Sequence, residues 1–295
     1  AVGETVYFSA GLDEVAPESL APLFEEELAM RTPREDFRSC LLNSALQFYY
    51  RPDATRGYLL AGYPWFGVRA RDLFIALPGC TIYADAPERF YRIMDTVIPD
   101  TRAFMNQVGV SKEIQGINEP DVGLWAIWTL QQYAHYAGNE DMVSRYGSFL
   151  DELIHYYLRN VHPNLRIDET GLCLIIGDGK PLSWMDAKIG GRAVVRREGY
   201  LVEVNALWYN ALCFYREVIP SRWDETLDKL LEQVKESFNH VFVNEHGYLF
   251  DYISPHTRQD WSVRPNMIFA ASLPYSPLSK QLLCGGDYHT RATYA

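Results

Sequence analysis

Helical spacing of apolar residues, repeated along most of the chain, is the sequence feature that most constrains the fold. After Pro33, a position where proline is tolerated before a helix, apolar residues recur at this spacing from Phe37 to Tyr49. Further helices are predicted at about 16–31, 69–78, 87–98, 121–138, 140–159, 201–217, 222–240 and 264–273. Antiparallel helices joined by alternately short and long connections predict an all-α helical toroid with elaborate loops on one face.

Strand signals are few and short. Two segments carry them, LCLIIG at 172–177 and YLFDYI at 248–253, and both lie between predicted helices. The longest predicted loop spans 161–199. Residues 1–33 have the character of an entry segment, so the expected organisation is this segment followed by one helical domain at 34–295.

Charge and hydropathy exclude several classes of partner. The formal net charge of -11 argues against nucleic acid or an anionic membrane as the main partner. No apolar run reaches about 18 residues, so no membrane span is predicted. The opening AVGETVYFSAGL lacks the basic and apolar regions of a signal peptide. We expect a cytoplasmic protein with reduced thiols, because the five cysteines show no metal-ligand or disulfide pattern: Cys40, Cys80, Cys173, Cys213 and Cys284.

The motifs of several common chemistries do not occur. The sequence has no GxSxG, no phosphate-binding GxxxxGK[ST] and no HExxH, and no cysteine lies in a nucleophile motif. We therefore expect no metal and no cofactor. Paired carboxylates remain as the general option, and they are the groups used for glycoside hydrolysis. An aromatic content of 14% suits a sugar-binding protein, although large cores also use rings.

The first stretch with chemical potential is AGYPWFGVRARD, residues 61–72. Its aromatic residues could stack on the apolar face of a pyranose, and Arg71 with Asp72 offers donors and acceptors for vicinal hydroxyls. A helix N-terminus with a local ion pair and a core tryptophan explains the same residues equally well.

The second stretch is INEPDVGLWAIWTLQQYAHY, residues 117–136. Asp121 opens a predicted helix that carries Trp125 and Trp128. Taken alone, an acid favoured by the helix dipole and a set of core aromatics explain it better than a binding site does.

The third stretch is GDGKPLSWMDAKIGGRAVVRREGYLVEVNALWYNAL, residues 177–212. It places Asp186 in a glycine-rich loop beside Trp184, ahead of a helix that carries Trp208. A carboxyl among tryptophans could have a raised pKa and act as a general acid. Loops on a rigid scaffold tend to carry function, which makes a mere turn-forming aspartate the weaker explanation here.

Five motifs in order resemble the glycosidase domain of glycogen debranching enzymes, the amylo-alpha-1,6-glucosidases. They run from about residue 7 to 280 and are AGYPWFGVRARD, DVGLWAIWTLQQY, LSWMDAKIGG, VEVNALWYNAL and VRPNMIFAASLPYSPLS. The resemblance implies an (α/α)6 toroid of twelve helices. It also implies release of glucose from α-1,6 branch stubs of an α-glucan, glycogen or a branched maltooligosaccharide, with inversion of configuration.

The resemblance also assigns roles to residues. Asp186 matches the general acid that protonates the glycosidic oxygen. Trp65, Arg71 and Asp72 match the subsite for the terminal glucose, and Asp121 with Trp125 matches a further sugar-contacting position. Glu203 and Asn205 match supporting residues near the acid. With these, the predicted substrate-binding set is Trp65, Arg71, Asp72, Asp121, Trp125, Trp184, Glu203, Asn205 and Trp208.

The sequence departs from the family at its C-terminus. The family's general base lies beyond the match to VRPNMIFAASLPYSPLS, and the late carboxylates Glu245, Asp251 and Asp260 do not match it. We therefore expect a toroid that is incomplete at its C-terminal end. The tail LLCGGDYHTRATYA does not resemble the family, and we hypothesise a one-base frameshift that replaced its natural continuation.

Three functions are compatible with these residues. The first is an inverting α-1,6-glucosidase of glycogen breakdown. The second is a non-catalytic α-glucan-binding remnant that lacks the base. The third is another toroid α-glucosidase, trehalase-like or glucoamylase-like, which the LSWMDAKIGG and VEVNALWYNAL stretches disfavour.

Overall fold

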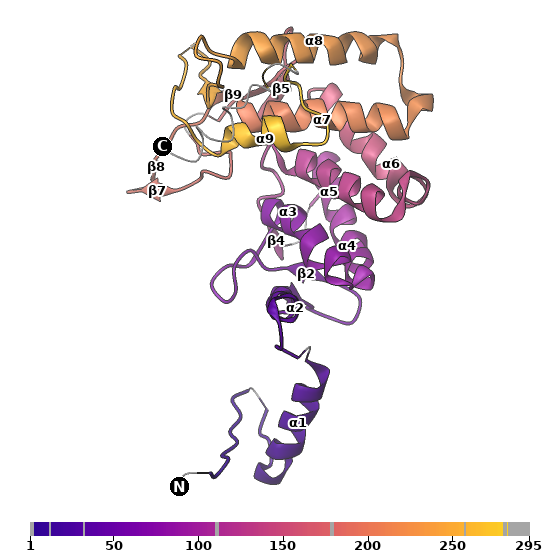
Figure 1. Cartoon of the computed structure of the whole chain (residues 1–295), viewed down its shortest axis with the longest axis vertical. Helices are drawn as coiled ribbons and strands as arrows, with labels where there is room; N and C mark the ends of the chain where they lie inside the picture. Colours follow the sequence, from indigo (N-terminus) through magenta and orange to yellow (C-terminus); the bar gives the residue numbers. More distant parts are fainter. Residues whose placement is uncertain are drawn as a thin grey trace.

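The computed structural model of the chain is mostly helical (Figure 1). It describes residues 3–11, 13–31, 33–109, 112–177, 180–256 and 258–279, together with residue 282. Its α-helices are α1 Leu20–Met30, α2 Phe37–Gln47, α3 Ala70–Cys80, α4 Pro87–Met105, α5 Val122–Ala137, α6 Asn139–Leu158, α7 Val202–Val218, α8 Glu225–Phe242 and α9 Asn266–Ser272. Each lies within a few residues of a predicted helix, apart from the C-terminal end of α4.

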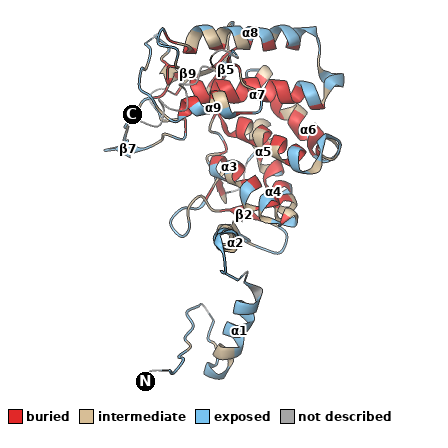
Figure 2. Cartoon of the chain, viewed as in Figure 1, coloured by how far each residue is buried: buried red, intermediate tan, exposed pale blue. Residues whose placement is uncertain are grey.

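The helix α7 is the centre of the core. It packs against α5, α6, α8 and α9, and it is buried on all sides (Figure 2). The helix α8 covers it and buries one stripe, at Leu227, Leu231, Val234, Phe238 and Phe242. This spacing is that of an outer helix with a single apolar face. The pair shows how the apolar pattern of each segment decides its layer.

A local signal explains where α2 begins, but no local signal explains where α4 ends. Asp36 and Ser39 form a reciprocal cap at the start of α2, with the Ser39 backbone N–H donating to the Asp36 carboxylate at 2.7 Å. The prediction that the helix from residue 87 ends at 98 was wrong. The helix α4 continues through Pro99 to Met105, because its buried stripe extends to Thr101 and tertiary packing outweighs the proline.

The structure also contains short strands, several of them in the region 161–199 that was predicted as the longest loop. In order along the chain, the strands are β1 Tyr49–Tyr50, β2 Tyr58–Leu59, β3 Val68–Arg69, β4 Ile114–Gln115, β5 Leu165–Ile167, β6 Cys173–Ile175, β7 Lys188–Ile189, β8 Arg192–Ala193, β9 Gly199–Leu201 and β10 Tyr252–Ile253. The strands β5, β6, β9 and β10 form one antiparallel sheet in the order β10-β9-β6-β5. Only β6 and β10 fall in segments with a predicted strand signal.

Gly199 explains how β9 fits beside β10. Its φ is +99°, and a Cβ at this position would lie 2.0 Å from the carbonyl oxygen of Ile253. Only glycine allows both this conformation and this close approach. The contact joins segments about 50 residues apart in the sequence, so local patterns could not reveal it.

The N-terminal segment stands apart from the helical body. Figure 1 shows α1 away from the other helices, and Figure 2 shows its surface largely exposed. Tyr7 packs against Phe24 of α1, with ring centroids 5.4 Å apart. The division into 1–33 and 34–295 stays a prediction, as does the (α/α)6 toroid that is incomplete at its C-terminal end. Cys284 and the tail tied to the frameshift hypothesis lie outside the described residues.

Candidate active site

Two helix starts meet beside the loop that carries Asp186. The strand β3, which leads into α3, pairs in parallel with β4, which precedes α5, and α3 packs against α5. Parallel pairing brings the N-terminal ends of the two helices together. Arg69, Arg71 and Asp72 come from the first of these ends, and Glu119 and Asp121 come from the second.

Arg71 is the buried centre of the group formed by these side chains. Its Nε and Nη2 donate to the two oxygens of Asp121 at 2.8 and 2.7 Å, and its Nη1 lies 2.6 Å from Glu119 Oε2. The indole N–H of Trp125 also donates to Asp121, at 3.1 Å. Arg71 and Asp121 are 4% and 2% exposed. The partners of Arg71, which are Asp121 and Glu119, are therefore about 50 residues away in the sequence. Its neighbour Asp72 lies near Arg69 instead.

Arg69 forms the exposed edge of the same group. Its Nη2 contacts Asp186 Oδ2 at 2.6 Å and Glu119 Oε1 at 3.3 Å, and its Nε lies 3.7 Å from Asp72 Oδ2. The Asp186 side chain is 37% exposed. We call Arg69, Arg71, Asp72, Glu119, Asp121 and Asp186 the open cluster, because it runs from the core to the surface.

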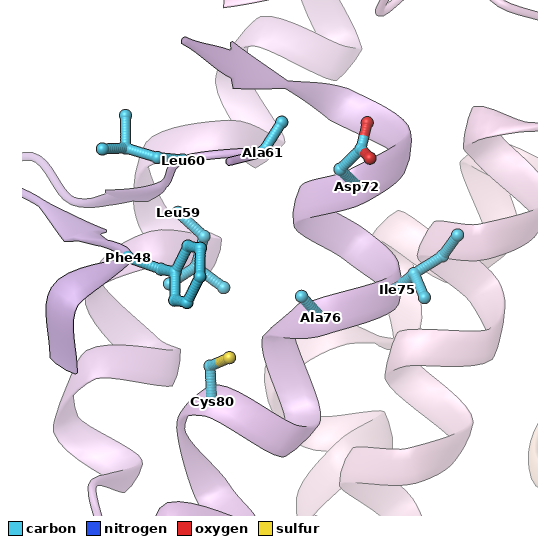
Figure 3. Close-up of a pocket in the computed structure, with 8 residues that line it drawn as sticks. All are labelled: Phe48, Leu59, Leu60, Ala61, Asp72, Ile75, Ala76 and Cys80. Atoms are coloured by element: carbon cyan, nitrogen blue, oxygen red, sulfur yellow. The ribbon is translucent and has the colours of Figure 1, made fainter. Parts of the chain in front are cut away.

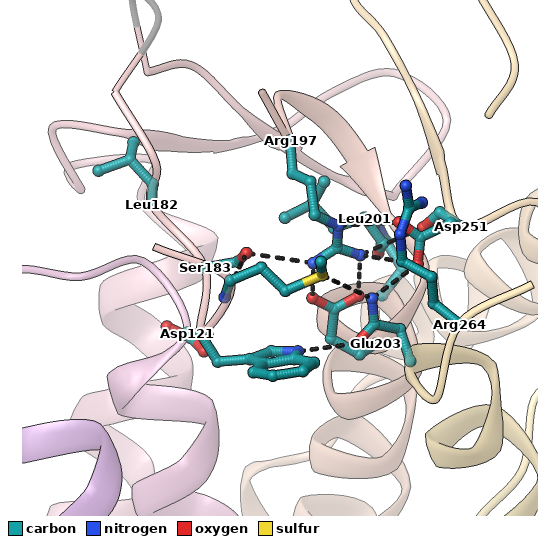
Figure 4. Close-up of polar contacts among 12 residues, drawn as sticks. Asp121, Leu182, Ser183, Arg197, Leu201, Glu203, Asp251 and Arg264 are labelled. Atoms are coloured by element: carbon teal, nitrogen blue, oxygen red, sulfur yellow. Dashed lines mark hydrogen bonds and ion pairs between the residues drawn. The ribbon is translucent and has the colours of Figure 1, made fainter. Parts of the chain in front are cut away.

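A second group lies behind the loop, and its members other than the partly exposed Arg264 are sealed from solvent (Figure 4). Arg197 donates to both oxygens of Glu203 at 2.5 and 2.7 Å, and to Asp251 Oδ2 at 3.0 Å. Arg264 contacts the same Asp251 oxygen at 2.8 Å. Arg197, Glu203 and Asp251 are 1%, 2% and 0% exposed. We call Arg197, Glu203, Asp251, Arg264 and Asn266 the sealed cluster.

The sealed cluster holds the residues next to Asp186. Arg197 Nη1 donates to Ser183 Oγ at 3.1 Å. Asn266 accepts a hydrogen bond from the Trp184 indole N–H at 2.7 Å and donates to the Asp251 carboxylate at 2.6 Å. On the other side, the carbonyl oxygen of Leu182 accepts from Arg71 at 3.5 Å. The segment before Asp186 is thus fixed from both clusters.

The predicted site residues divide into exposed and buried sets. Trp65 is 84% exposed and Trp184 is 46% exposed, so both offer ring surface to a ligand. Asn205 and Trp208 are fully buried. Asn205 bonds the backbone of Cys173 in both directions, and the Trp208 indole N–H donates to the Gly171 carbonyl. Sugar contact by any of these residues stays a prediction.

Arg69 and Glu119 are members of the open cluster that sequence reasoning did not single out. Arg69 lies inside AGYPWFGVRARD, two residues before Arg71, and Glu119 lies two residues before Asp121. Position next to the selected residues was the available signal. Burial raises the pKa of the Glu119 carboxyl, and Asp121 and Asp186 add to this effect while the two arginines oppose it.

Glu119 and Asp186 are too close to act as an inverting pair in this arrangement. The contacting oxygens lie 3.3 and 2.6 Å from a single nitrogen of Arg69. Two oxygens so placed cannot be separated by the roughly 6.5–9.5 Å that an inverting pair needs. Of the late carboxylates, Asp251 belongs to the sealed cluster and Asp260 pairs with Arg264 at 2.7 Å.

A hollow of about 280 Å³ lies on the face of α3 that turns toward Phe48 and β2 (Figure 3). Its lining is apolar apart from Asp72. The hollow is defined by Phe48, Leu59, Leu60, Ala61, Asp72, Ile75, Ala76 and Cys80. Asp72 therefore lines this hollow and also lies near Arg69, whereas the Arg71 side chain contacts Asp121 at the start of α5.

Within the part of the chain that the structure describes, no group of three or more histidine, cysteine or acidic side chains is arranged to hold a metal ion. Over the same residues, no helix combines the length and the apolar character needed to cross a bilayer.

Comparisons with known proteins place the chain in a family. No curated protein matches it. Among solved structures, a GH78 family rhamnosidase of Bacillus sp. GL1 is similar over 56% of this chain and 16% of its own length, at 19% identity and a TM-score of 0.43. The family model described as amylo-alpha-1,6-glucosidase matches residues 43–284. Because that match spans most of the sequence and includes both clusters, the chain belongs to the amylo-alpha-1,6-glucosidase family.

Proposed function

We propose that the chain is a glycogen debranching glucosidase, which releases α-1,6-linked glucose with inversion and uses Asp186 as the general acid. The observation that carries the proposal is the setting of Asp186. Its carboxyl is 37% exposed and contacts Arg69, and it follows the half-exposed Trp184 by two residues on a segment that the sealed cluster fixes. A general acid needs such a fixed position, because proton transfer depends on reach to the glycosidic oxygen.

We assign the other residues by exposure. Trp65 and Trp184 provide ring faces for the sugar, and Asp72 and Arg69 provide hydrogen-bonding groups for its hydroxyls. Arg71, Asp121 and Trp125 hold this surface from the core. Glu203, Asn205 and Trp208 support the acid by fixing β6, β9 and the segment before Asp186.

The proposed substrate is glycogen or a branched maltooligosaccharide with a single α-1,6-linked glucose. The family description and the exposed rings support this substrate. The proposed reaction needs only water and two carboxyl groups. We also propose a cytoplasmic location. The thiols Cys40, Cys80, Cys173 and Cys213 are free, which suits a reducing compartment.

A second candidate function is α-glucan binding without hydrolysis. It is favoured by the state of the late carboxylates, because Asp251 and Asp260 are engaged by arginines and Glu119 is too close to Asp186. On this proposal the exposed tryptophans bind a glucan, and no carboxylate activates water opposite the acid.

Proton NMR of the chain acting on a maltooligosaccharide with one α-1,6-linked glucose tests both candidates. Early appearance of β-glucose supports the inverting glucosidase, and early α-glucose contradicts inversion. Asp186→Asn should lower turnover about 10²- to 10⁴-fold, whereas the matched control Asp228→Asn, at an exposed position on α8, should leave it unchanged. Unaltered turnover in Asp186→Asn would remove that residue from the acid role. Sugar-induced shifts without glucose release favour the second candidate.

A further inference from the structure

A small hollow lies behind Glu119, enclosed by α4, α5 and α6. Its walls include Phe104, Gly123, Tyr157 and His162, and Glu119 completes them. The volume is about 10 Å³, which is close to the roughly 10–15 Å³ that one water molecule requires. A larger ligand does not fit such a space.

His162 lines this hollow and has an unpartnered ring nitrogen. The residue is 6% exposed, and its Nε2 has no hydrogen-bond partner among the described residues. Its Nδ1 accepts a hydrogen bond from the backbone N–H of Asn164 at 3.0 Å. Because an accepting Nδ1 carries no proton, the neutral ring must carry its proton on Nε2. A buried N–H donor without an acceptor is costly, so an acceptor is required.

The other polar side chains that line the hollow are Thr101, Glu119, Tyr156 and Tyr157, and Glu119 is the one with a carboxylate, the strongest acceptor among them. The hydroxyl of Tyr157 already donates to the Pro120 carbonyl at 2.9 Å. Glu119 uses one oxygen for Arg69 and the other for Arg71. Each carboxylate oxygen can accept more than one hydrogen bond, so Glu119 keeps capacity for a donor from the hollow.

We propose that this hollow binds one ordered water molecule, which accepts a hydrogen bond from His162 Nε2–H and donates one to the Glu119 carboxylate. The water links the ring system of α4 and α6 to the open cluster. It holds Glu119 between Arg69 and Arg71, and His162 is a positioning residue for that carboxylate. The proposed water site does not depend on the proposed glucosidase activity. Only an influence of this water on Asp186, through Arg69, rests on that activity.

The wild-type chain provides the first test. Long-range ¹H–¹⁵N NMR of the histidine rings should find His162 neutral at pH 7 with its proton on Nε2, and that proton should show a cross-peak to a long-lived water. A crystal structure at about 1.5 Å should place a water within hydrogen-bond distance of both Nε2 and Glu119. A proton on Nδ1, a direct contact between Nε2 and Glu119, or a hollow without ordered water overturns the proposal.

Two variants then test the positioning role by the titration of Glu119, followed through its ¹³C carboxyl signal. His162→Phe removes the donor, so the midpoint should rise by roughly 0.5–1 pH unit, the equivalent of one hydrogen bond to the charged form. His162→Gln keeps an N–H donor and should restore a value near that of the wild type. The charged and titratable neighbours are unchanged in both variants: Arg69, Arg71, Asp121, Tyr156, Tyr157 and Asp186. Equal midpoints in the two variants overturn the role of His162, whether or not the chain hydrolyses glucan.

Discussion

The open and sealed clusters both consist of arginines and carboxylates, yet they differ in access to water. In the sealed cluster, Arg197 is 1% exposed and lies between Glu203 and Asp251. In the open cluster, the Arg69 side chain is 30% exposed and shares its charge among three carboxylates. Because it is buried, the sealed cluster holds its side chains in one arrangement and supports the loop. Exposure leaves the open cluster able to exchange its contacts for those of a ligand.

The largest expected effect comes from removing the central arginine of the sealed cluster. Arg197→Ala removes the buried counter-charge of Glu203 and leaves Asp251 with Arg264, so the free energy of unfolding should fall by about 3–5 kcal/mol. Urea denaturation at pH 7 measures it. The same truncation at Arg69 is the matched control and should cost less than about 1 kcal/mol, because its charge pairs are partly hydrated. Equal losses at the two sites would contradict the contrast between the clusters.

The second prediction concerns the buried wall behind the open cluster. Burial lowers the pKa of His162 to about 4, against about 6.5 in an unfolded chain. Between pH 4 and 6.5 the unfolded state therefore binds more protons than the folded state. The stability that depends on neutral His162 is present above pH 6.5 and is lost as the pH falls to 4. At about 1.4 kcal/mol per pKa unit, this contribution is about 3 kcal/mol.

Urea denaturation at pH 7, 5.5 and 4 should show a steeper acid loss in the wild type than in His162→Phe. His155→Phe, at a half-exposed position on α6, is the matched control. Parallel pH profiles for wild type and His162→Phe would contradict the second prediction.

A smaller effect is expected where the sealed cluster touches the loop. Asn266→Ala removes the hydrogen bonds to Trp184 and to the fully buried Asp251, and should cost about 1–3 kcal/mol because a charge-assisted hydrogen bond inside the cluster is lost. Tryptophan fluorescence should shift to longer wavelength as the Trp184 ring becomes more hydrated. The Trp184→Phe background assigns that signal, and a shift that persists in it would exclude Trp184 as the source.

The smallest expected effect is at the exposed ring of Trp65. Trp65→Ala should leave the free energy of unfolding within about 0.5 kcal/mol, because the side chain is 84% exposed. Glucan binding, measured by calorimetry, should weaken by about 1 kcal/mol, roughly fivefold, from lost apolar contact area. A large loss of stability with unchanged binding would instead make Trp65 a packing residue.

Most of the fold could be predicted because helices depend on nearby residues. The apolar patterns of α7 and α8 are local signals, and these helices formed where the patterns indicated. The end of α4 could not be predicted, because the packing of its last turns outweighs Pro99. The sheet could not be predicted either, because β9 is stabilised by β6 and β10 rather than by its own sequence.

The site was predictable as a set of segments but not as a set of contacts. The sequence by itself determined the helices, the family, and the presence of Arg71, Asp121 and Asp186 in three separate motifs. Only the tertiary structure decided that Arg71 pairs with Asp121 rather than with Asp72, and that Arg69 joins Glu119 to Asp186. The physical reason is distance along the chain. Helix formation is set within a few residues, whereas these charge partners are 50 or more residues apart and meet only when β3 pairs with β4 and Asp186 of the loop contacts Arg69.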